Sequence, residues 1–498
     1  MVNTRSLWLM AILCTAACAK KEEPSPSAKS SEATAMPAPA PPAAPPARAE
    51  VPITSKYPEA IAAFKQGRDL NDQLRFAEAI EFFNKAIQLD PDFALAHAHL
   101  GMLTPGVEGE TMLRKASTLA AALPEAEKTY IEAALLQRQG EDARSAQLLA
   151  RVGELAPGEW RVFYALGLRA TNGRKFDEAI ARYKQAAEAN PESAVVHNGL
   201  AYAYAAQRRY DDAVAAAKKQ TELLPNEPNP QDTLGEILLM AGRFPESEAA
   251  YLKAIDLSPK FAVAWEGVAL ARFYRADWSG GYAALAKGKQ AAALPEDRVL
   301  FDFDQAWAKL GEGKPAEAMK LLDTLDQSAD IKQLPQAWVE VAEARAAMSY
   351  AQGKYADAGK QLAQMQERAD KSKLPGVGQK AMKRRNLVLT LAVQSKQGKG
   401  KDADKTLAAI AEASKDAPPQ FGSALVMARG LQKWATGDLK GAITELSGCW
   451  EDDFVCHWEL AMAQEKAGDK AGAEATRKQI GSKHYRDPAF LWFSRPQK

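Results

Sequence analysis

The chain has 498 residues, of which 47% are hydrophobic, and its formal net charge is +1 at pH 7. This balance offers no overall electrostatic attraction to nucleic acid or to anionic membranes, so we expect no nucleic-acid partner. Leu, Ala, Glu, Lys and Gln recur along the whole chain, whereas runs of Val, Ile and Thr are missing. The composition therefore predicts an all-α protein.

Residues 1–18 have the features of a bacterial export signal. Their apolar core, residues 7–13, is too short to span a bilayer permanently. The next residues end in Cys18 and resemble a lipoprotein box, which implies that Cys18 is the lipidated residue. Two alternatives remain open, namely ordinary cleavage after Ala19 in an A-x-A pattern and no export at all.

A lipid on Cys18 would make the protein a cell-envelope lipoprotein whose only contact with the membrane is the anchor. Ala19 favours sorting to the outer membrane, with the protein facing the periplasm, whereas the alternatives make it secreted or cytoplasmic. Residues 19–52 are rich in Pro and Ala and have no apolar periodicity. Because no core offsets the entropy of ordering them, we expect a disordered linker.

A period of 34 residues runs through the middle of the chain. It is marked by four prolines, Pro157, Pro191, Pro225 and Pro259. Small residues return midway along the first helix expected in each period, at Gly167, Ala201 and Gly235. Others return early in the expected second helix, at Ala179, Ala213 and Ser247. Small side chains at facing positions let two antiparallel helices approach closely, so each period predicts one helix hairpin.

These residues and their spacing resemble the tetratricopeptide repeat (TPR), a 34-residue helix–turn–helix family. The resemblance implies a right-handed α-solenoid, and Gly-x4-Ala turns in the second half extend it to about eleven or twelve TPR-like hairpins. We assign residues 53–295 to an N-terminal TPR array and residues 296–482 to a diverged TPR-like array. Longer loops are expected near residues 328–335, 372–378 and 415–421.

Residues 483–498 form an aromatic C-terminal tail. We expect its apolar side chains to fold over the open face of the last hairpin as a cap. The alternative is an exposed patch that binds a partner.

The four cysteines divide into two pairs. Signal cleavage would remove Cys14 and lipidation would use Cys18, which leaves Cys449 and Cys456. An even pair in an oxidising compartment suggests a disulfide that joins two adjacent repeats. The alternative is a pair of small buried apolar residues, which are common between packed helices.

Nothing in the sequence indicates catalysis, a metal site or a cofactor. His97 and His99 lie two residues apart on one expected helix, hence on nearly opposite faces, and cannot easily share a metal. Zinc-protease, serine-hydrolase and phosphate-loop motifs are missing from the sequence. We therefore expect a protein that is not an enzyme.

The resemblance also implies a binding surface, because the first helices of TPR hairpins line a concave groove. The positions expected to line it are Tyr164, Leu168, Asn198, Tyr202, Asp232, Glu236 and Glu266. Tyr side chains beside Asp and Glu would suit an extended peptide that carries Lys or Arg and apolar anchors. The alternative is an ordinary solvated polar face.

A second charged region lies between residues 370 and 405, where ten basic residues accompany three acids. It predicts either solvent-facing charges beside a loop or a contact with anionic lipid headgroups or an acidic partner. Together these features predict a non-catalytic scaffold of the bacterial cell envelope that binds a protein or peptide on the concave face. The alternative is a cytoplasmic regulatory scaffold, if residues 1–18 are not an export signal.

Overall fold

The computed structural model describes residues 49–73, 75–372, 374, 376–415 and 422–494. Helices account for most of this part of the chain, and it contains no β-strand. The first half contains α1 (Pro58–Asp72), α2 (Phe76–Leu89), α3 (Ala94–Leu103), α4 (Gly106–Leu119), a 3-10 helix (Ala120–Ala122), α5 (Glu125–Arg138), α6 (Asp142–Leu155), α7 (Trp160–Asn172), α8 (Phe176–Ala189), α9 (Ala194–Ala206), α10 (Tyr210–Leu223), α11 (Pro228–Met240), α12 (Phe244–Leu257), α13 (Ala264–Phe273) and α14 (Trp278–Ala291).

The second half contains α15 (Pro295–Glu312), α16 (Pro315–Asp326), α17 (Ala329–Gln333), α18 (Pro335–Ala351), α19 (Tyr355–Lys371), α20 (Gly376–Lys396), α21 (Gly400–Ala413), α22 (Gly422–Ala435), α23 (Leu439–Leu446), α24 (Phe454–Lys466), α25 (Lys470–Gly481) and α26 (Phe490–Phe493). Apart from α17 and α26, consecutive helices pair as antiparallel hairpins from α1·α2 to α24·α25. The expected α-solenoid of eleven or twelve hairpins is confirmed, since the described helices form twelve.

Close glycine–tyrosine contacts set the distance between neighbouring hairpins. The ring of Tyr183 is fully buried between Gly167 of its own hairpin and Gly199 of the next one. A Cβ atom at Gly167 would stand 2.6 Å from two carbons of this ring, and one at Gly199 would stand 2.8 Å from it. Because these distances are far below a normal carbon contact, both positions require glycine.

The turn inside most hairpins uses one residue with a left-handed backbone. Gly313 is an ordinary example, with φ 90°, since glycine adopts this conformation without a Cβ penalty. Arg174 and Arg208 stand at the same kind of turn with φ 59° and 58°. A non-glycine residue is disfavoured in this conformation, which Ala276 also adopts, with φ 61°.

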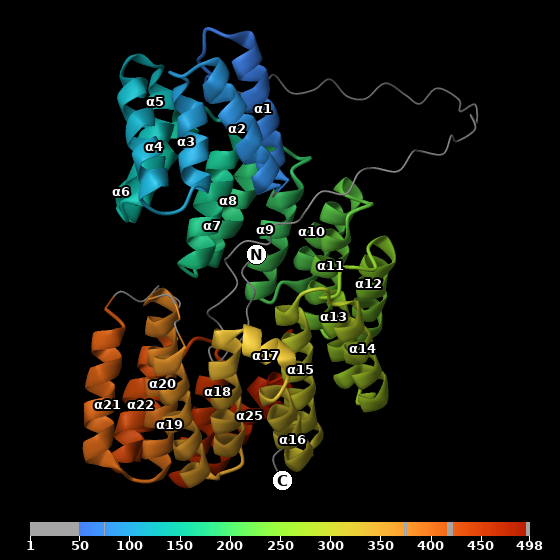
Figure 1. Ribbon diagram of the computed structural model, residues 1–498. Helices are drawn as coiled ribbons and strands as arrows, with labels where there is room; N and C mark the ends of the chain where they lie inside the picture. Colours follow the sequence, from blue (N-terminus) through green and yellow to red (C-terminus); the bar gives the residue numbers. More distant parts are fainter. Residues whose placement is uncertain (1–48, 74, 373, 375, 416–421, 495–498) are drawn as a thin grey trace, which may run out of the picture.

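Both arginines reach across the superhelix to its C-terminal part. The guanidinium of Arg174 lies 4.4 Å from the ring centre of Trp450 and forms an ion pair with Asp452 at 2.6 Å. Arg208 forms an ion pair with the neighbouring Glu451. Figure 1 shows the resulting arrangement, in which the orange and red C-terminal hairpins lie below α7 and α9. The solenoid therefore curls back until its two halves touch.

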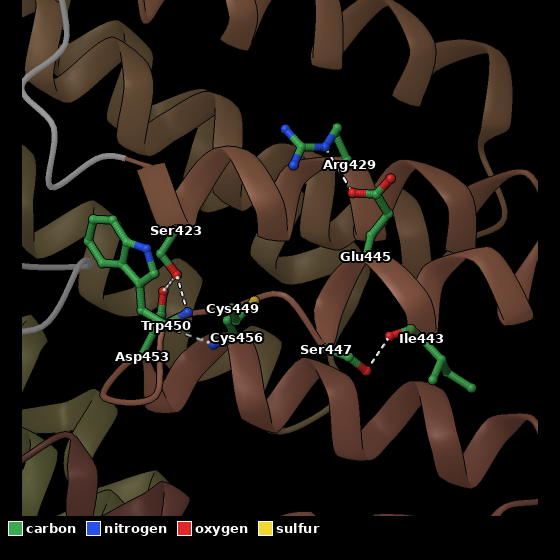
Figure 2. Close-up of a disulfide and its surroundings, with 9 residues drawn as sticks. All are labelled: Ser423, Arg429, Ile443, Glu445, Ser447, Cys449, Trp450, Asp453 and Cys456. Atoms are coloured by element: carbon green, nitrogen blue, oxygen red, sulfur yellow. Dashed lines mark hydrogen bonds and ion pairs between the residues drawn. A yellow bond between two sulfur atoms is a disulfide. The ribbon is translucent and has the colours of Figure 1, made fainter.

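Cys449 and Cys456 are paired, with their Cα atoms 6.2 Å apart, and they enclose the loop that carries these contacts. The Ser423 hydroxyl donates to Asp453 at 2.6 Å and accepts the Trp450 N–H at 3.4 Å (Figure 2). The loop is thus held by Ser423 of α22 and by its own disulfide. Cys449 follows α23 and Cys456 lies in α24, so the pair joins adjacent hairpins.

Two segments differ from the expected linker and loop. Residues 49–52, assigned above to the linker, belong to the folded body: Val51 is buried and the Gly158 N–H donates to the Ala49 carbonyl at 2.7 Å. Residues 329–333 form the short helix α17 rather than a loop, because the Ser328 hydroxyl caps it by accepting the Ile331 N–H. The expected export signal, Cys18 and the rest of the linker lie outside the described residues.

The aromatic tail packs on α24 of the last hairpin, as expected of a cap, through contacts of Phe493 with Phe454 and Trp458. It also runs along the inner side of the solenoid, where α26 contacts α15, and this part of its position was not expected. Phe490 is completely buried against Phe454 and Tyr485, with ring centres 5.0 and 4.8 Å away. Residues 483–493, called the C-terminal segment below, therefore belong to the interior.

Candidate functional site

The first helices of successive hairpins form the inner row of the solenoid, because α7, α9, α11 and α13 contact one another in that order. The groove residues expected from the sequence occupy two equivalent positions of this row, each repeating after 34 residues. One position holds Tyr164, Asn198, Asp232 and Glu266, and the other holds Leu168, Tyr202 and Glu236. The repeat thus aligns their side chains along one face.

Asp232, Glu236 and Glu266, called the acidic cluster below, surround one arginine of the C-terminal segment. Arg486 donates from one terminal nitrogen to Asp232 at 2.7 Å, and the same nitrogen lies 3.5 Å from Glu236. Its Nε lies 3.5 Å from Glu266. All four residues are more than nine-tenths buried. The residues expected to bind a partner's basic side chain therefore hold a basic side chain of the chain itself.

Burial and mutual charge control ionisation at this site. Burial raises the pKa of Glu236, and although Arg486 opposes this shift, Asp232 adds to it. Burial alone would lower the pKa of Arg486, but the carboxylates, Asp232 first, keep it above its usual value. The Tyr202 hydroxyl donates to Glu236 at 3.0 Å, and its pKa is raised by burial and by that carboxylate. A charged guanidinium is thus the favoured occupant.

The backbone of the C-terminal segment is held beside the acidic cluster. The Tyr274 hydroxyl donates to the Tyr485 carbonyl at 2.8 Å and accepts the Tyr485 N–H at 3.0 Å. The ring of His484 packs edge-on against Phe244 and Tyr274, with ring centres 4.8 and 5.1 Å away. The inner face therefore binds a chain segment through backbone groups, a cation and aromatic rings together.

The N-terminal end of the expected groove is free of the segment. Leu168 is 39% exposed, and Tyr164 is half-buried against Trp160 and Tyr183. The amide of Asn198 donates to Thr233 at 3.1 Å and so serves contact between repeats. This end offers an accessible apolar and aromatic surface next to the acidic cluster.

A second polar cluster on the inner row was not expected from the sequence. Glu459 accepts a hydrogen bond from the Tyr350 hydroxyl at 2.6 Å and pairs with Lys396 at 2.7 Å. Burial lowers the pKa of Lys396 to about 8, although Glu459 opposes the shift. The three residues come from three diverged repeats, and their spacing follows no 34-residue period, so sequence offered no signal for the cluster.

The basic stretch also contributes to the interior. Arg385 is buried and forms a two-pronged ion pair with Glu343, whose pKa is nonetheless raised by burial. At least this part of the stretch is not a surface for a partner.

Over the described ranges, no group of three or more His, Cys, Asp or Glu side chains could hold a metal ion. Within the same part of the chain, the helices lack the length and apolar character needed to cross a bilayer.

A solenoid of helix hairpins whose inner row holds a peptide segment belongs to the class of protein–protein interaction scaffolds. A family model described as tetratricopeptide repeat matches residues 164–228, and a second model with this description matches residues 72–93. The chain therefore contains tetratricopeptide repeats in these two segments. No curated protein matches the sequence.

Solved structures with similarity to the chain include several helical repeat proteins. The crystal structure of yeast Tom70 shares 16% identity and a TM-score of 0.42, covering 84% of this chain and 96% of Tom70. MamA from Desulfovibrio magneticus RS-1 shares 13% identity and a TM-score of 0.32, and the match covers 34% of this chain and 97% of the MamA chain. PilW, a type IV pilus biogenesis factor, shares 14% identity and a TM-score of 0.34, and the match covers 43% of this chain and 99% of PilW. At these values the similarity carries no information on a partner.

Proposed function

We propose that this protein is a non-catalytic scaffold of the bacterial cell envelope that binds a peptide segment of another protein on its inner face. One observation carries the proposal: the inner face holds an eleven-residue segment, residues 483–493, through a buried arginine, a clamped backbone and aromatic contacts. A surface with these features is suited to peptide recognition.

The envelope setting is supported by the sequence of residues 1–18 and by the Cys449–Cys456 pair. Disulfides persist in oxidising compartments outside the cytosol. In this proposal Cys18 carries the lipid, and the Pro-rich linker lets the solenoid reach partners away from the membrane.

Two measurements in the native host test the proposal. The intact mass of the membrane-bound protein should match a chain that begins at a triacylated Cys18, whereas a mass that retains Met1 would exclude export. A photo-cross-linking amino acid at Leu168, on the inner row, should capture a specific protein. The control position is Val107 in α4, which is 81% exposed and lies on a second helix. Equal capture from both positions would exclude the inner face as the binding surface.

A further inference from the structure

The C-terminal segment satisfies the acidic cluster only in part. Three carboxylates surround a single guanidinium, which donates a hydrogen bond of 2.7 Å to Asp232 and lies 3.5 Å from each of the other two. The second carboxylate oxygen of Asp232, Oδ1, is buried and has no hydrogen-bond partner. The hydroxyl of the completely buried Tyr251 has none either, although its ring lies 5.2 Å from the Arg486 guanidinium. Buried polar atoms are rarely left unpaired, so these two atoms indicate a ligand that fits better.

The orientation of the Arg486 guanidinium explains why Oδ1 of Asp232 has no hydrogen-bond partner. It binds Asp232 through a single terminal nitrogen, while its other terminal nitrogen donates to the Val263 carbonyl at 2.9 Å. A guanidinium that approached Asp232 with both terminal nitrogens would use Oδ1 as well and form the stronger two-pronged pair. Arg486 is prevented from doing so because the adjoining residues are held by Tyr274 and by the buried α26.

The link between α25 and the C-terminal segment lies at the surface. Gly481 and Ser482, which connect α25 to Lys483, are both exposed. Two side chains of the segment bind the inner face: the guanidinium of Arg486 and, four residues later, the ring of Phe490. Neither contact depends on the segment belonging to the same chain.

From these observations we propose that the C-terminal segment occupies the partner's binding site as long as no partner is bound. The partner of the scaffold presents an arginine followed four residues later by an aromatic residue, and this segment displaces residues 483–493 from the acidic cluster. The inference rests on the proposed function, since it specifies the chemistry of the peptide bound there. It also makes access to the acidic cluster, though not to the free end at Leu168, dependent on release of the C-terminal segment.

The test uses a fluorescently labelled synthetic peptide of residues 483–493 and the full-length protein. The Arg486→Ala variant should bind the peptide at least about tenfold more tightly than the wild type, because its own segment no longer competes. The matched control is Arg477→Ala, which removes an arginine of α25 that pairs with Glu465 outside the cluster and should leave the affinity unchanged. A peptide with alanine in place of the arginine should bind at least about tenfold more weakly.

A second variant keeps the test decisive if Arg486→Ala fails to fold. Tyr274→Phe removes both hydrogen bonds to the Tyr485 backbone but keeps the ring, so it should also increase peptide affinity. Folded variants that bind the peptide no better than the wild type would make the segment a fixed structural element and overturn the inference. A variant that forms dimers by light scattering would also overturn it, since the occupant would be a second copy. The cross-linking result at Leu168 is independent of these outcomes, so failure of the inference and failure of the proposed function are distinguishable.

Discussion

Replacing Gly167 by leucine should destabilise the solenoid at a defined helix contact. The Tyr183 ring is 1% exposed, and a Cβ atom at Gly167 would stand 2.6 Å from its Cδ1 and Cε1 atoms. Normal carbon contacts are about 3.5–4.0 Å, so the ring or the helix must move by about 1 Å. The ring cannot move away easily because Gly199 confines it on the other side. We expect the free energy of unfolding to fall by about 2–3 kcal/mol, towards the upper end for overpacked sites.

The matched control is Gly359→Leu in α19. A Cβ atom at Gly359 would meet nothing within 4 Å, so the larger side chain fits there. Leucine also favours a helix interior over glycine, and this variant should gain about 0.5–1 kcal/mol. Guanidinium denaturation followed by circular dichroism measures both variants. The double variant Gly167→Leu/Tyr183→Leu should lose less than the sum of its single changes. A Gly167→Leu protein as stable as the wild type would refute the assigned contact between the repeats.

Three further predictions concern buried groups. Burial lowers the pKa of His99 to about 3, so the folded state resists its protonation and the unfolding free energy should fall as pH decreases from about 6.5 towards 3. The loss reaches about 2 kcal/mol at pH 5, and His99→Phe should remove it in denaturation series across pH. Arg385→Met should cost about 3–5 kcal/mol because it leaves the Glu343 carboxylate buried alone, while adding Glu343→Leu should restore most of this in the same assay. Reduction of the Cys449–Cys456 bond should cost about 2–3 kcal/mol, and a thiol titration of the untreated protein that finds both cysteines free would exclude the bond.

The repeated part of the fold could be predicted from the sequence because its signals are local and periodic. Gly167 and Ala179 recur at a fixed offset, and each hairpin needs only its neighbours to bury its apolar face. The same period placed Tyr202, Asp232 and Glu236 on one face of the inner row. Their acidic character favoured a basic neighbour, and the guanidinium beside them is that of Arg486 in the same chain, while the expected partner peptide stays a prediction.

The position of the C-terminal segment could not be predicted in this way. Arg486 pairs with Asp232 across 254 residues, and no periodic pattern connects the two positions. The curvature that brings Arg174 to Asp452 is the sum of many small rotations between hairpins, which a sequence period does not reveal. One signal was present: a single arginine inside the aromatic run of residues 485–493 is unusual for a simple apolar cap.

Hydrogen–deuterium exchange of the C-terminal segment in the full-length protein tests the central claim most directly. The Tyr485 N–H donates to the Tyr274 hydroxyl, and the Phe490 and Leu491 N–H groups donate to the Asp487 and Pro488 carbonyls. Peptides that cover residues 483–493 should therefore exchange slowly in the wild type and faster in the Arg486→Ala variant. Exchange of this segment at the rate of an unstructured peptide in the wild type would contradict the account, because the inner face would then be open.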